Sequence, residues 1–223
     1  MRILITAGPT REHLDPVRFL SNPSTGKMGF AVAKAAVEAG HDAVLVSSPV
    51  SLKTPKGVSR IDVISAREMF EAVKSEFGKC DAIVMTAAVA DWRPVKMADK
   101  KLKKSEMSGV IELVRNPDVL KSLKPVNAKY AKKGKRKIMV GFAAETGEPT
   151  AEAARKCKEK GLDFVVANDV TESKSGFGVS TNRVTFVCSD GRVVPLPLMS
   201  KLAVARKIIK EISKPIAIHH ESL

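Results

Sequence analysis

The sequence has few cysteines and few aromatic residues, and each shortage counts against a class of protein. Cys80, Cys157 and Cys188 are the only cysteines among 223 residues, and no two of them form a Cys-x-x-Cys pair. An odd, dispersed set of thiols is typical of a reducing compartment, so we expect no disulfide framework. Trp92 and Tyr130 are the only Trp and Tyr. Stacking side chains that usually accompany nucleic-acid binding are therefore scarce.

Metal-site and membrane signals are also missing. His13 and His41 stand alone, and His219 and His220 are adjacent near the end of the sequence, so structural zinc is not expected. No apolar run approaches the length of a membrane span, and Met1 leads directly into an expected strand rather than a signal peptide. We therefore expect a cytoplasmic protein with no membrane partner.

Two common nucleotide-binding motifs are absent. The dinucleotide fingerprint needs three closely spaced glycines, but Gly8, Gly26 and Gly29 are far apart. A phosphate-binding P-loop needs glycine and a hydroxyl residue where Ser21 and Met28 stand. If the chain binds a nucleotide, it does so by another arrangement.

Positive charge is in excess, with 38 lysines and arginines against 24 aspartates and glutamates and a net charge of +14. The excess is concentrated in two blocks, residues 96–104 and 129–137. A basic protein is expected to meet anionic partners, either polyphosphate metabolites or nucleic acid. The alternative is that both blocks are solvated surface.

Short apolar runs that favour strands alternate with segments of helical spacing. The expected strands are 2–7, 42–47, 59–64, 81–86, 110–114, 137–144, 164–167, 183–189 and 192–196, and the expected helices are 26–40, 66–77, 119–123, 150–160 and 199–212. This alternation predicts an α/β fold: a Rossmann-like, doubly wound, mostly parallel sheet flanked by helices. Residues 1–223 are expected to form a single domain, with a lysine-rich flap over 95–109 inside an appendage of about 95–135. The second lysine block is interpreted as a surface linker or the exposed end of the helix that starts at 119.

A long polar connection, residues 9–25, joins the first strand to the first helix. Such a connection at a helix N-terminus is typical of function, because free backbone N–H groups and the helix dipole attract anions there. We interpret this stretch as an anion or nucleotide site. For Gly26 and Gly29 alone, close helix–strand packing is the equally weighted alternative.

Polar or small residues follow the ends of several expected strands. In parallel sheets ligands bind beyond the carboxyl ends of the strands, where Gly8-Pro9 and residues 88–91 fall. These stretches are therefore expected to meet in space. Asn168-Asp169 falls at the same edge and is either a turn or part of the site.

Five stretches share their order and spacing with a known family. They are residues 15–18 with 21–29, residues 87–91, the Lys-x-Lys-Lys cluster at 101–104, the Asn-Pro-Asp turn at 116–118, and residues 141–146. Together they resemble phosphopantothenoylcysteine synthetase of the coenzyme A pathway, in its prokaryotic form. The resemblance runs from about residue 2 to residue 212.

The resemblance implies a two-step ligation. The carboxylate of 4′-phosphopantothenate attacks the α-phosphate of CTP, which gives an acyl-cytidylate and pyrophosphate, and the amine of L-cysteine then displaces CMP. It also implies a need for Mg2+, whose ligands are not assigned, and a homodimer in which each phosphopantothenate site uses residues from both subunits. A small β-hairpin extension is expected to serve dimerisation.

The resemblance further implies roles for single residues. Lys101 is expected to help form the acyl-nucleotide, Asn22 to handle that intermediate, and Arg18 to act beside it. Phosphopantothenate binding is expected at Arg18, Asn22 and Ala88. Nucleotide binding is expected at Met85, Thr86, Ala87, Asp91, Lys101, Pro117, Asp118, Val119, Leu120, Phe142, Lys156 and Lys160.

General chemistry is consistent with these roles. A carboxylate and a triphosphate repel one another, so cations must surround both, and the protein contributes mainly positioning and charge. Lysines on a flap can close over the triphosphate and exclude water. The Asn22 amide can donate a hydrogen bond to the carbonyl oxygen under attack. Lys156 and Lys160 are four residues apart on one helical face, so both can reach one polyphosphate.

Several alternatives stay open. ATP is the alternative nucleotide, although the lysine cluster and the Asn-Pro-Asp turn favour CTP. Most prokaryotic relatives carry a flavin-dependent decarboxylase domain before this one, so the chain is expected to be a stand-alone synthetase or an excised domain. A basic nucleic-acid-binding protein is the second hypothesis, and an NADP-linked reductase with Ser47-Ser48 near the adenosine phosphate is the third. We favour small-metabolite partners over nucleic acid.

Overall fold

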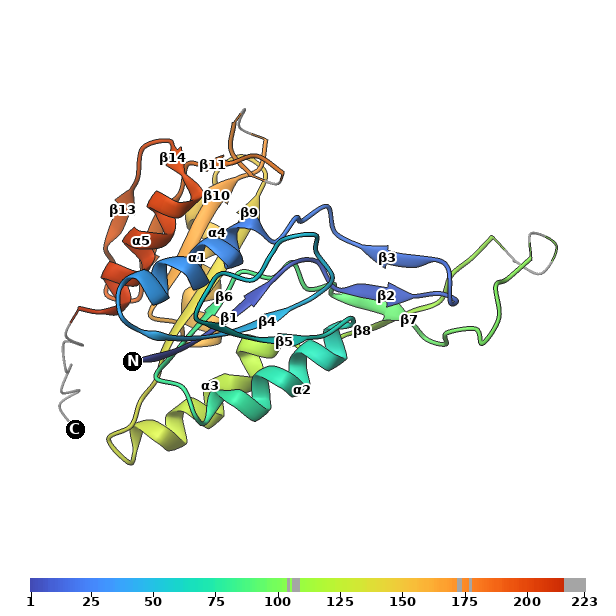
Figure 1. The fold of residues 1–223 in the computed structure, drawn as a ribbon, viewed down its shortest axis with the longest axis horizontal. Helices are drawn as coiled ribbons and strands as arrows, with labels where there is room; N and C mark the ends of the chain where they lie inside the picture. Colours follow the sequence, from blue (N-terminus) through green and yellow to red (C-terminus); the bar gives the residue numbers. More distant parts are fainter. Residues whose placement is uncertain (104, 106–108, 172–173, 177, 215–223) are drawn as a thin grey trace.

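A central sheet of eight strands organises the part of the chain that the structure describes. The computed structural model describes residues 1–103, 105, 109–171, 174–176 and 178–214. The strands of the sheet are β1 (Arg2–Ala7), β4 (Asp42–Ser47), β5 (Val58–Asp62), β6 (Ala82–Met85), β9 (Ile138–Glu145), β10 (Phe164–Asp169), β12 (Thr185–Cys188) and β13 (Val193–Pro195). Their order is β13-β12-β10-β9-β6-β1-β4-β5, parallel from β10 to β5 and antiparallel at β12 and β13 (Figure 1). The predicted α/β fold with a mostly parallel sheet is confirmed.

Helices cover both faces of this sheet (Figure 1). Those in the described residues are α1 (Lys27–Glu38), α2 (Ala66–Phe77), α3 (Val119–Ala131), α4 (Pro149–Lys160) and α5 (Lys201–Ile212). Side chains of β1 alternate between two cores: Ile3 and Ile5 pack with α1 and α5, and Leu4 packs with α2, α3 and α4. The sheet is therefore buried on both faces, as parallel sheets generally are.

Helix α2 shows why the stronger sequence signals were reliable. Ser65 caps it by accepting a hydrogen bond from the backbone N–H of Glu68 at 3.2 Å, and the Ser65 hydroxyl donates to the Glu68 carboxylate at 3.0 Å. Met69, Val73 and Phe77 form its buried stripe. Cap and stripe both agree with the helical spacing, so the predicted range matches the observed one.

Helix α3 is longer than predicted, because it continues past Leu123 to Ala131. Pro125 argues against helix there, since proline removes an intrahelical hydrogen bond. Packing overrides this preference: the buried amide of Asn127 exchanges two hydrogen bonds of 2.8 Å with the backbone of Lys137. The second lysine block is thus partly the end of a helix.

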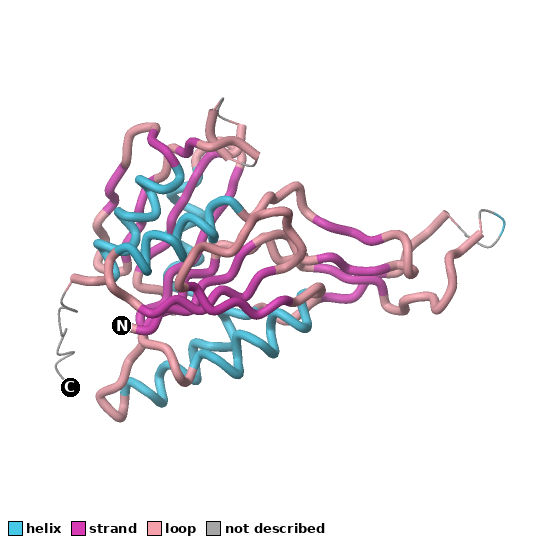
Figure 2. The backbone as a smooth tube through the Cα atoms, viewed as in Figure 1, coloured by secondary structure: helices cyan, strands magenta, loops and turns pink. Residues whose placement is uncertain are grey.

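An arm projects from the body of the molecule, and we define it as residues 11–21 and 92–115, as far as they are described (Figures 1 and 2). It contains two antiparallel pairs, β2 (Arg11–His13) with β3 (Phe19–Ser21) and β7 (Trp92–Pro94) with β8 (Leu113–Arg115). The described residues of the connection from β7 to β8 extend beyond these strands, away from the body (Figure 1). The appendage therefore differs from the expected 95–135: it gains residues 11–21, and α3 belongs to the body.

Gly29 allows α1 to lie directly on the sheet. A Cβ at this position would stand 2.6 Å from the Cβ of Ala7 and 2.7 Å from the carbonyl oxygen of Thr6. Real Cβ atoms do not approach so closely, so a side chain here would push α1 away from β1. The packing interpretation of Gly29 is thus supported by the structure.

We expect Gly29→Ala to lower the free energy of unfolding by about 1–3 kcal/mol, because overpacking forces the backbone to shift. Urea denaturation measures the change. Lys34→Ala is the control, because Lys34 is an exposed residue of the same helix and its replacement should change stability by no more than about 0.5 kcal/mol. Equal urea midpoints for Gly29→Ala and the parent chain would contradict this interpretation.

Candidate functional site

A cavity of about 330 Å³ lies at the carboxyl ends of the parallel strands. It is bounded by the ends of β6, β9 and β10 and by the N-termini of α1 and α3. This is the edge at which ligands bind in parallel α/β sheets, and the volume falls in the range of small-molecule sites. Its lining is Ser24, Thr25, Gly26, Lys27, Met28, Met85, Thr86, Ala87, Ala88, Val89, Ala90, Asp91, Asn116, Pro117, Asp118, Val119, Leu120, Phe142, Ala144, Lys156, Lys160, Asn168, Gly176, Asn182 and Lys201.

Every residue predicted to bind the nucleotide lines this cavity, with the exception of Lys101. Those brought together are Met85, Thr86, Ala87, Asp91, Pro117, Asp118, Val119, Leu120, Phe142, Lys156 and Lys160. Ala88, predicted to bind phosphopantothenate, lies among them. Their convergence is a finding of the structure, and their contact with a nucleotide stays a prediction.

The loop after β6 is fixed by hydrogen bonds to the end of β1. The backbone N–H of Ala88 donates to the carbonyl of Gly8 at 3.0 Å, and the N–H of Thr10 donates to the carbonyl of Ala88 at 3.2 Å. The buried Thr10 hydroxyl accepts from the N–H of Ala90 at 2.9 Å. These bonds hold one wall of the cavity in place before any ligand binds, which reduces the entropy cost of binding.

The N-terminus of α1 is open to a ligand. Gly26 occupies its cap position in a left-handed conformation with φ 77°, and no side chain caps the first turn. A left-handed backbone favours glycine, so Gly26 shapes the turn that brings α1 to the cavity. The uncapped N–H groups and the helix dipole favour an anion here. By contrast, Asp118 caps α3 by accepting from the backbone N–H of Lys121 at 3.0 Å.

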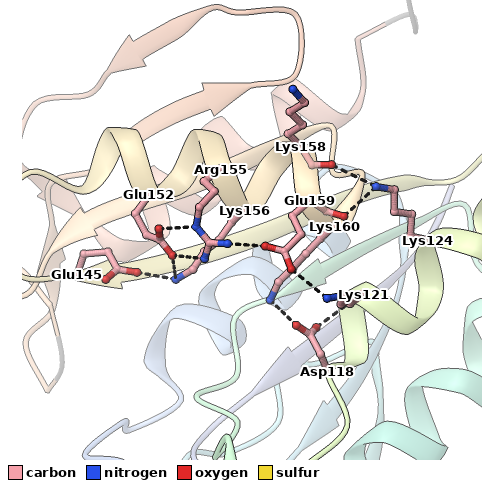
Figure 3. A network of polar contacts seen from close by, with 10 residues as sticks. All are labelled: Asp118, Lys121, Lys124, Glu145, Glu152, Arg155, Lys156, Lys158, Glu159 and Lys160. Carbon is pink, nitrogen blue, oxygen red and sulfur yellow. Dashed lines mark hydrogen bonds and ion pairs between the residues drawn. The ribbon is translucent and has the colours of Figure 1, made fainter.

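Lys156 and Lys160 of α4 each have a carboxylate partner (Figure 3). The Nζ atom of Lys156 lies 2.5 Å from Glu145 Oε1, and that of Lys160 lies 2.9 Å from Asp118 Oδ2. Hydrogen bonds from Arg155, followed by smaller effects that include the Lys156 charge, lower the pKa of Glu152 to about 2. On the α4 side of the cavity, much of the positive charge is therefore neutralised by carboxylates of the protein itself.

Asn22 and Arg18 do not line the cavity but lie on the segment that leads to it. The Asn22 side-chain amide donates a hydrogen bond to the carbonyl of Ala88 at 3.2 Å, which places it beside the cavity wall. Arg18 is held by the buried carboxylate of Asp15, with Nε and Nη2 donating at 3.0 and 2.6 Å. The hydrogen bonds from Arg18 keep the pKa of Asp15 well below its usual range.

Lys101 belongs to the arm rather than to the cavity of its own chain. The next residue, Leu102, is anchored there: its N–H donates to Asp15 Oδ2 at 3.2 Å and its carbonyl accepts from Arg18 Nη2 at 2.9 Å. The connection that carries Lys101 extends away from the body (Figure 1). The structure thus does not bring Lys101 to the other predicted nucleotide residues of the same chain. Lys104, which completes the Lys-x-Lys-Lys cluster, lies outside the described residues.

The cavity offers few ligands for a metal ion. Among the described residues there is no group of three or more His, Cys, Asp or Glu side chains that could hold one. Asp91 lines the cavity, and its carboxylate forms no ion pair with any described residue. Mg2+ is commonly held by one or two carboxylates together with substrate phosphates. This donor set therefore fits a Mg2+ ion that binds along with a polyphosphate.

The sequence patterns did not identify three of the residues that line the cavity. Lys201, Asn182 and Gly176 reach the cavity through tertiary contacts. Lys201 follows β14 (Met199–Ser200), which pairs with β11 (Thr181–Asn182). Strands of two residues leave no periodic signal in the sequence. The helix expected at 199–212 therefore could not be placed at the site from the sequence. Asn168, left open as a turn or a site residue, lines the cavity.

No helix in the described part of the chain has the length and apolar character needed to cross a membrane.

Comparison with known proteins places the chain in a family. Residues 1–216 match the family described as DNA/pantothenate metabolism flavoprotein C-terminal domain. The coenzyme A biosynthesis bifunctional protein CoaBC of Bacillus subtilis is 48% identical over 212 residues, which cover 95% of this chain and 50% of that protein. The protein of the same name from Escherichia coli K12 is 43% identical over 215 residues, covering 95% and 51%. This chain thus spans about half the length of these curated relatives.

A solved structure gives the same result at the level of the fold. The crystal structure of the C-terminal domain of a coenzyme A biosynthesis bifunctional protein CoaBC is 42% identical to this chain, with a TM-score of 0.77. The match covers 95% of this chain and 93% of that one. The chain belongs to the family of DNA/pantothenate metabolism flavoprotein C-terminal domains.

Proposed function

We propose that this chain ligates 4′-phosphopantothenate to L-cysteine at the expense of CTP, as a step of coenzyme A biosynthesis. One observation above all supports this function: residues far apart in the sequence, assigned to nucleotide binding by the resemblance, line a single cavity. The names of the relatives, which are coenzyme A biosynthesis proteins, support the same pathway. CTP rather than ATP is inferred from the lysine cluster and the Asn-Pro-Asp turn at 116–118.

In the first step a carboxylate oxygen of 4′-phosphopantothenate attacks the α-phosphorus of CTP. The bond from that phosphorus to the bridging oxygen breaks, pyrophosphate leaves, and a 4′-phosphopantothenoyl-cytidylate remains. The chain contributes orientation and positive charge: the N-terminus of α1 and Lys27 lie along the cavity, and Lys101 is delivered by an arm. Mg2+, held by Asp91 and the phosphates, would supply further positive charge to the phosphate oxygens.

In the second step the amine of cysteine attacks the activated carbonyl carbon. The C–O bond to CMP breaks after negative charge has developed on the carbonyl oxygen, and the amine loses a proton as the amide forms. Asn22 stands beside Ala88 at the cavity wall, so its amide can donate to that oxygen. No covalent bond to the protein is needed in either step.

We propose that two chains form a homodimer through their arms. Exposed apolar side chains cluster on the arm: Val17, Phe19, Trp92, Val95, Met97, Ile111, Leu113 and Val114. An exposed apolar patch of this kind marks a protein–protein contact. A second copy is the partner we infer, because its arm would bring a Lys101 to a cavity that its own chain leaves without one. The cytoplasmic location stays a prediction.

The proposal is tested by incubating the purified chain with 4′-phosphopantothenate, L-cysteine, Mg2+ and either CTP or ATP, and by following the products by mass spectrometry. We expect phosphopantothenoylcysteine and CMP in the CTP reaction. Formation of the same product only with ATP would keep the ligation and overturn the choice of nucleotide. A folded chain that forms no amide with either nucleotide would overturn the proposed function.

A further inference from the structure

The two walls of the cavity differ in how their positive charge is balanced. On the α4 side, Lys156 and Lys160 are paired with Glu145 and Asp118 (Figure 3). On the opposite side of the sheet, α1 contributes Lys27 and α5 contributes Lys201. Neither of these two lysines forms an ion pair with any carboxylate of the described residues. The positive charge that is not neutralised by a protein carboxylate, and is thus available to a bound anion, therefore lies on the α1 and α5 side of the cavity.

Lys201 is buried, with only 7% of its surface exposed, and among the described lysines only Lys137 is buried to the same extent. Its Nζ atom donates hydrogen bonds to the carbonyl oxygens of Gly176 and Val179, both at 2.7 Å. An ammonium group can donate three hydrogen bonds, so these two leave one donor for another acceptor. Burying a charge is costly unless an opposite charge compensates it, and carbonyl dipoles do so only in part.

Lys27 approaches the same turn from α1. Its Nζ atom donates to the carbonyl oxygen of Gly178 at 2.5 Å, which lies in sequence between the Gly176 and Val179 carbonyls that Lys201 binds. Burial and, as the second cause, the charge of Lys27 lower the pKa of Lys201 to about 8. Two like charges thus lie at one turn of the cavity wall, and a polyanion bound to both would relieve their repulsion. The uncapped N-terminus of α1, which starts at Lys27 itself, adds to this field.

We propose that Lys27 and Lys201 form the polyphosphate subsite of the cavity and bind the phosphates of the nucleotide directly. This inference deepens the proposed function, because it rests on the cavity being the nucleotide site. It differs from the expectation that Lys156 and Lys160 together carry the polyphosphate: those two are bound to carboxylates and would have to leave them first.

The test is a set of binding constants measured by isothermal titration calorimetry with CMP, CTP and inorganic tripolyphosphate, each in the presence of Mg2+. The variants are Lys27→Met, Lys201→Met and Lys201→Arg. Lys207→Met is the matched control, since it removes the same charge from an exposed position of α5 outside the cavity. Tripolyphosphate makes the test independent of which base the cavity prefers.

We expect each Met variant to bind CTP and tripolyphosphate at least about tenfold more weakly than the parent chain. The reason is that each variant loses a charge-assisted hydrogen bond to the phosphates of the ligand. Binding of CMP should change little, so the ratio of the CMP to the CTP dissociation constant should fall. Lys201→Arg should retain part of the affinity, and Lys207→Met should behave as the parent chain. A purely structural role would weaken CMP and CTP by the same factor.

Equal losses for CMP and CTP, or parental affinity for CTP in both Met variants, would overturn the subsite. Should Lys201→Met fail to fold, Lys27→Met applies the same test at a half-buried residue. A parent chain that binds neither CTP nor tripolyphosphate would also overturn it. A chain that shows the expected binding pattern but forms no phosphopantothenoylcysteine would keep the subsite and reject the proposed reaction.

Discussion

Replacement of Lys101 by glutamine should block release of pyrophosphate from CTP, with a rate at least about 10² to 10³ times lower than that of the parent chain. Glutamine has similar bulk but no charge, so the triphosphate loses a cation as the carboxylate approaches it. The measurement is pyrophosphate release with 4′-phosphopantothenate present and cysteine withheld. The nucleotide cavity itself should stay intact, because Lys101 lies on the arm and does not line it.

Lys100→Gln is the control for this prediction. Lys100 is an exposed neighbour in the same connection of the arm, and the resemblance gives it no role. Its replacement should leave pyrophosphate release close to the parental rate. Parental release by Lys101→Gln would refute the role of Lys101 in forming the acyl-nucleotide.

Asn22→Asp should have the second large effect, on the other half of the reaction. We expect the acyl-nucleotide to form and accumulate, and its reaction with cysteine to slow by about 10² to 10³, the usual cost of losing an oxyanion donor. The Asn22 amide donates to the Ala88 carbonyl at the cavity wall, whereas a carboxylate there would repel both that oxygen and the developing negative charge. Single-turnover measurements with cysteine added after the first step separate the two rates.

Ser21→Ala is the matched control for Asn22→Asp. The Ser21 hydroxyl binds the carbonyl of Thr10 at 2.8 Å on the same segment but does not line the cavity. Its loss should leave both steps nearly unchanged. If Asn22→Asp makes phosphopantothenoylcysteine at the parental rate, Asn22 does not act on the intermediate.

The two variants together test the proposed dimer. If each cavity takes Lys101 from its partner, a heterodimer of Lys101→Gln with Asn22→Asp has one site with both native residues. Equal mixing with exchange of subunits should then restore about a quarter of the parental activity, as expected for a symmetric dimer. Activity no higher than the mean of the two variants would place Lys101 in the site of its own chain.

The sequence predicted the body of the fold because its elements carry strong local patterns. Continuous apolar runs indicated β1, β4 and β6, and α2 combines a cap with a buried stripe. The arm strands β2, β3 and β7 went unpredicted, since strands of three residues are too short for a periodic pattern. The length of α3 was missed for another reason: the contact between Asn127 and Lys137 outweighs the local effect of Pro125.

Much of the candidate site followed from topology. Residues after β1 and β6, such as Ala88 and Asp91, were expected to meet because parallel strands end at the same edge. Lys201 could not be found this way, since its burial depends on the pairing of β11 with β14 and on contacts to Gly176 and Val179. The position of Lys101 on the arm, away from its own cavity, likewise depends on how residues 11–21 pack beside residues 92–115.

The most direct test of the proposed reaction withholds cysteine. The purified chain is incubated with 4′-phosphopantothenate, Mg2+ and CTP, and the mixture is examined by mass spectrometry before and after cysteine is added. We expect 4′-phosphopantothenoyl-cytidylate and pyrophosphate first, and conversion of that intermediate to phosphopantothenoylcysteine and CMP on addition of cysteine. Absence of any acyl-nucleotide and of pyrophosphate, from a folded chain that binds CTP, would contradict the proposed mechanism.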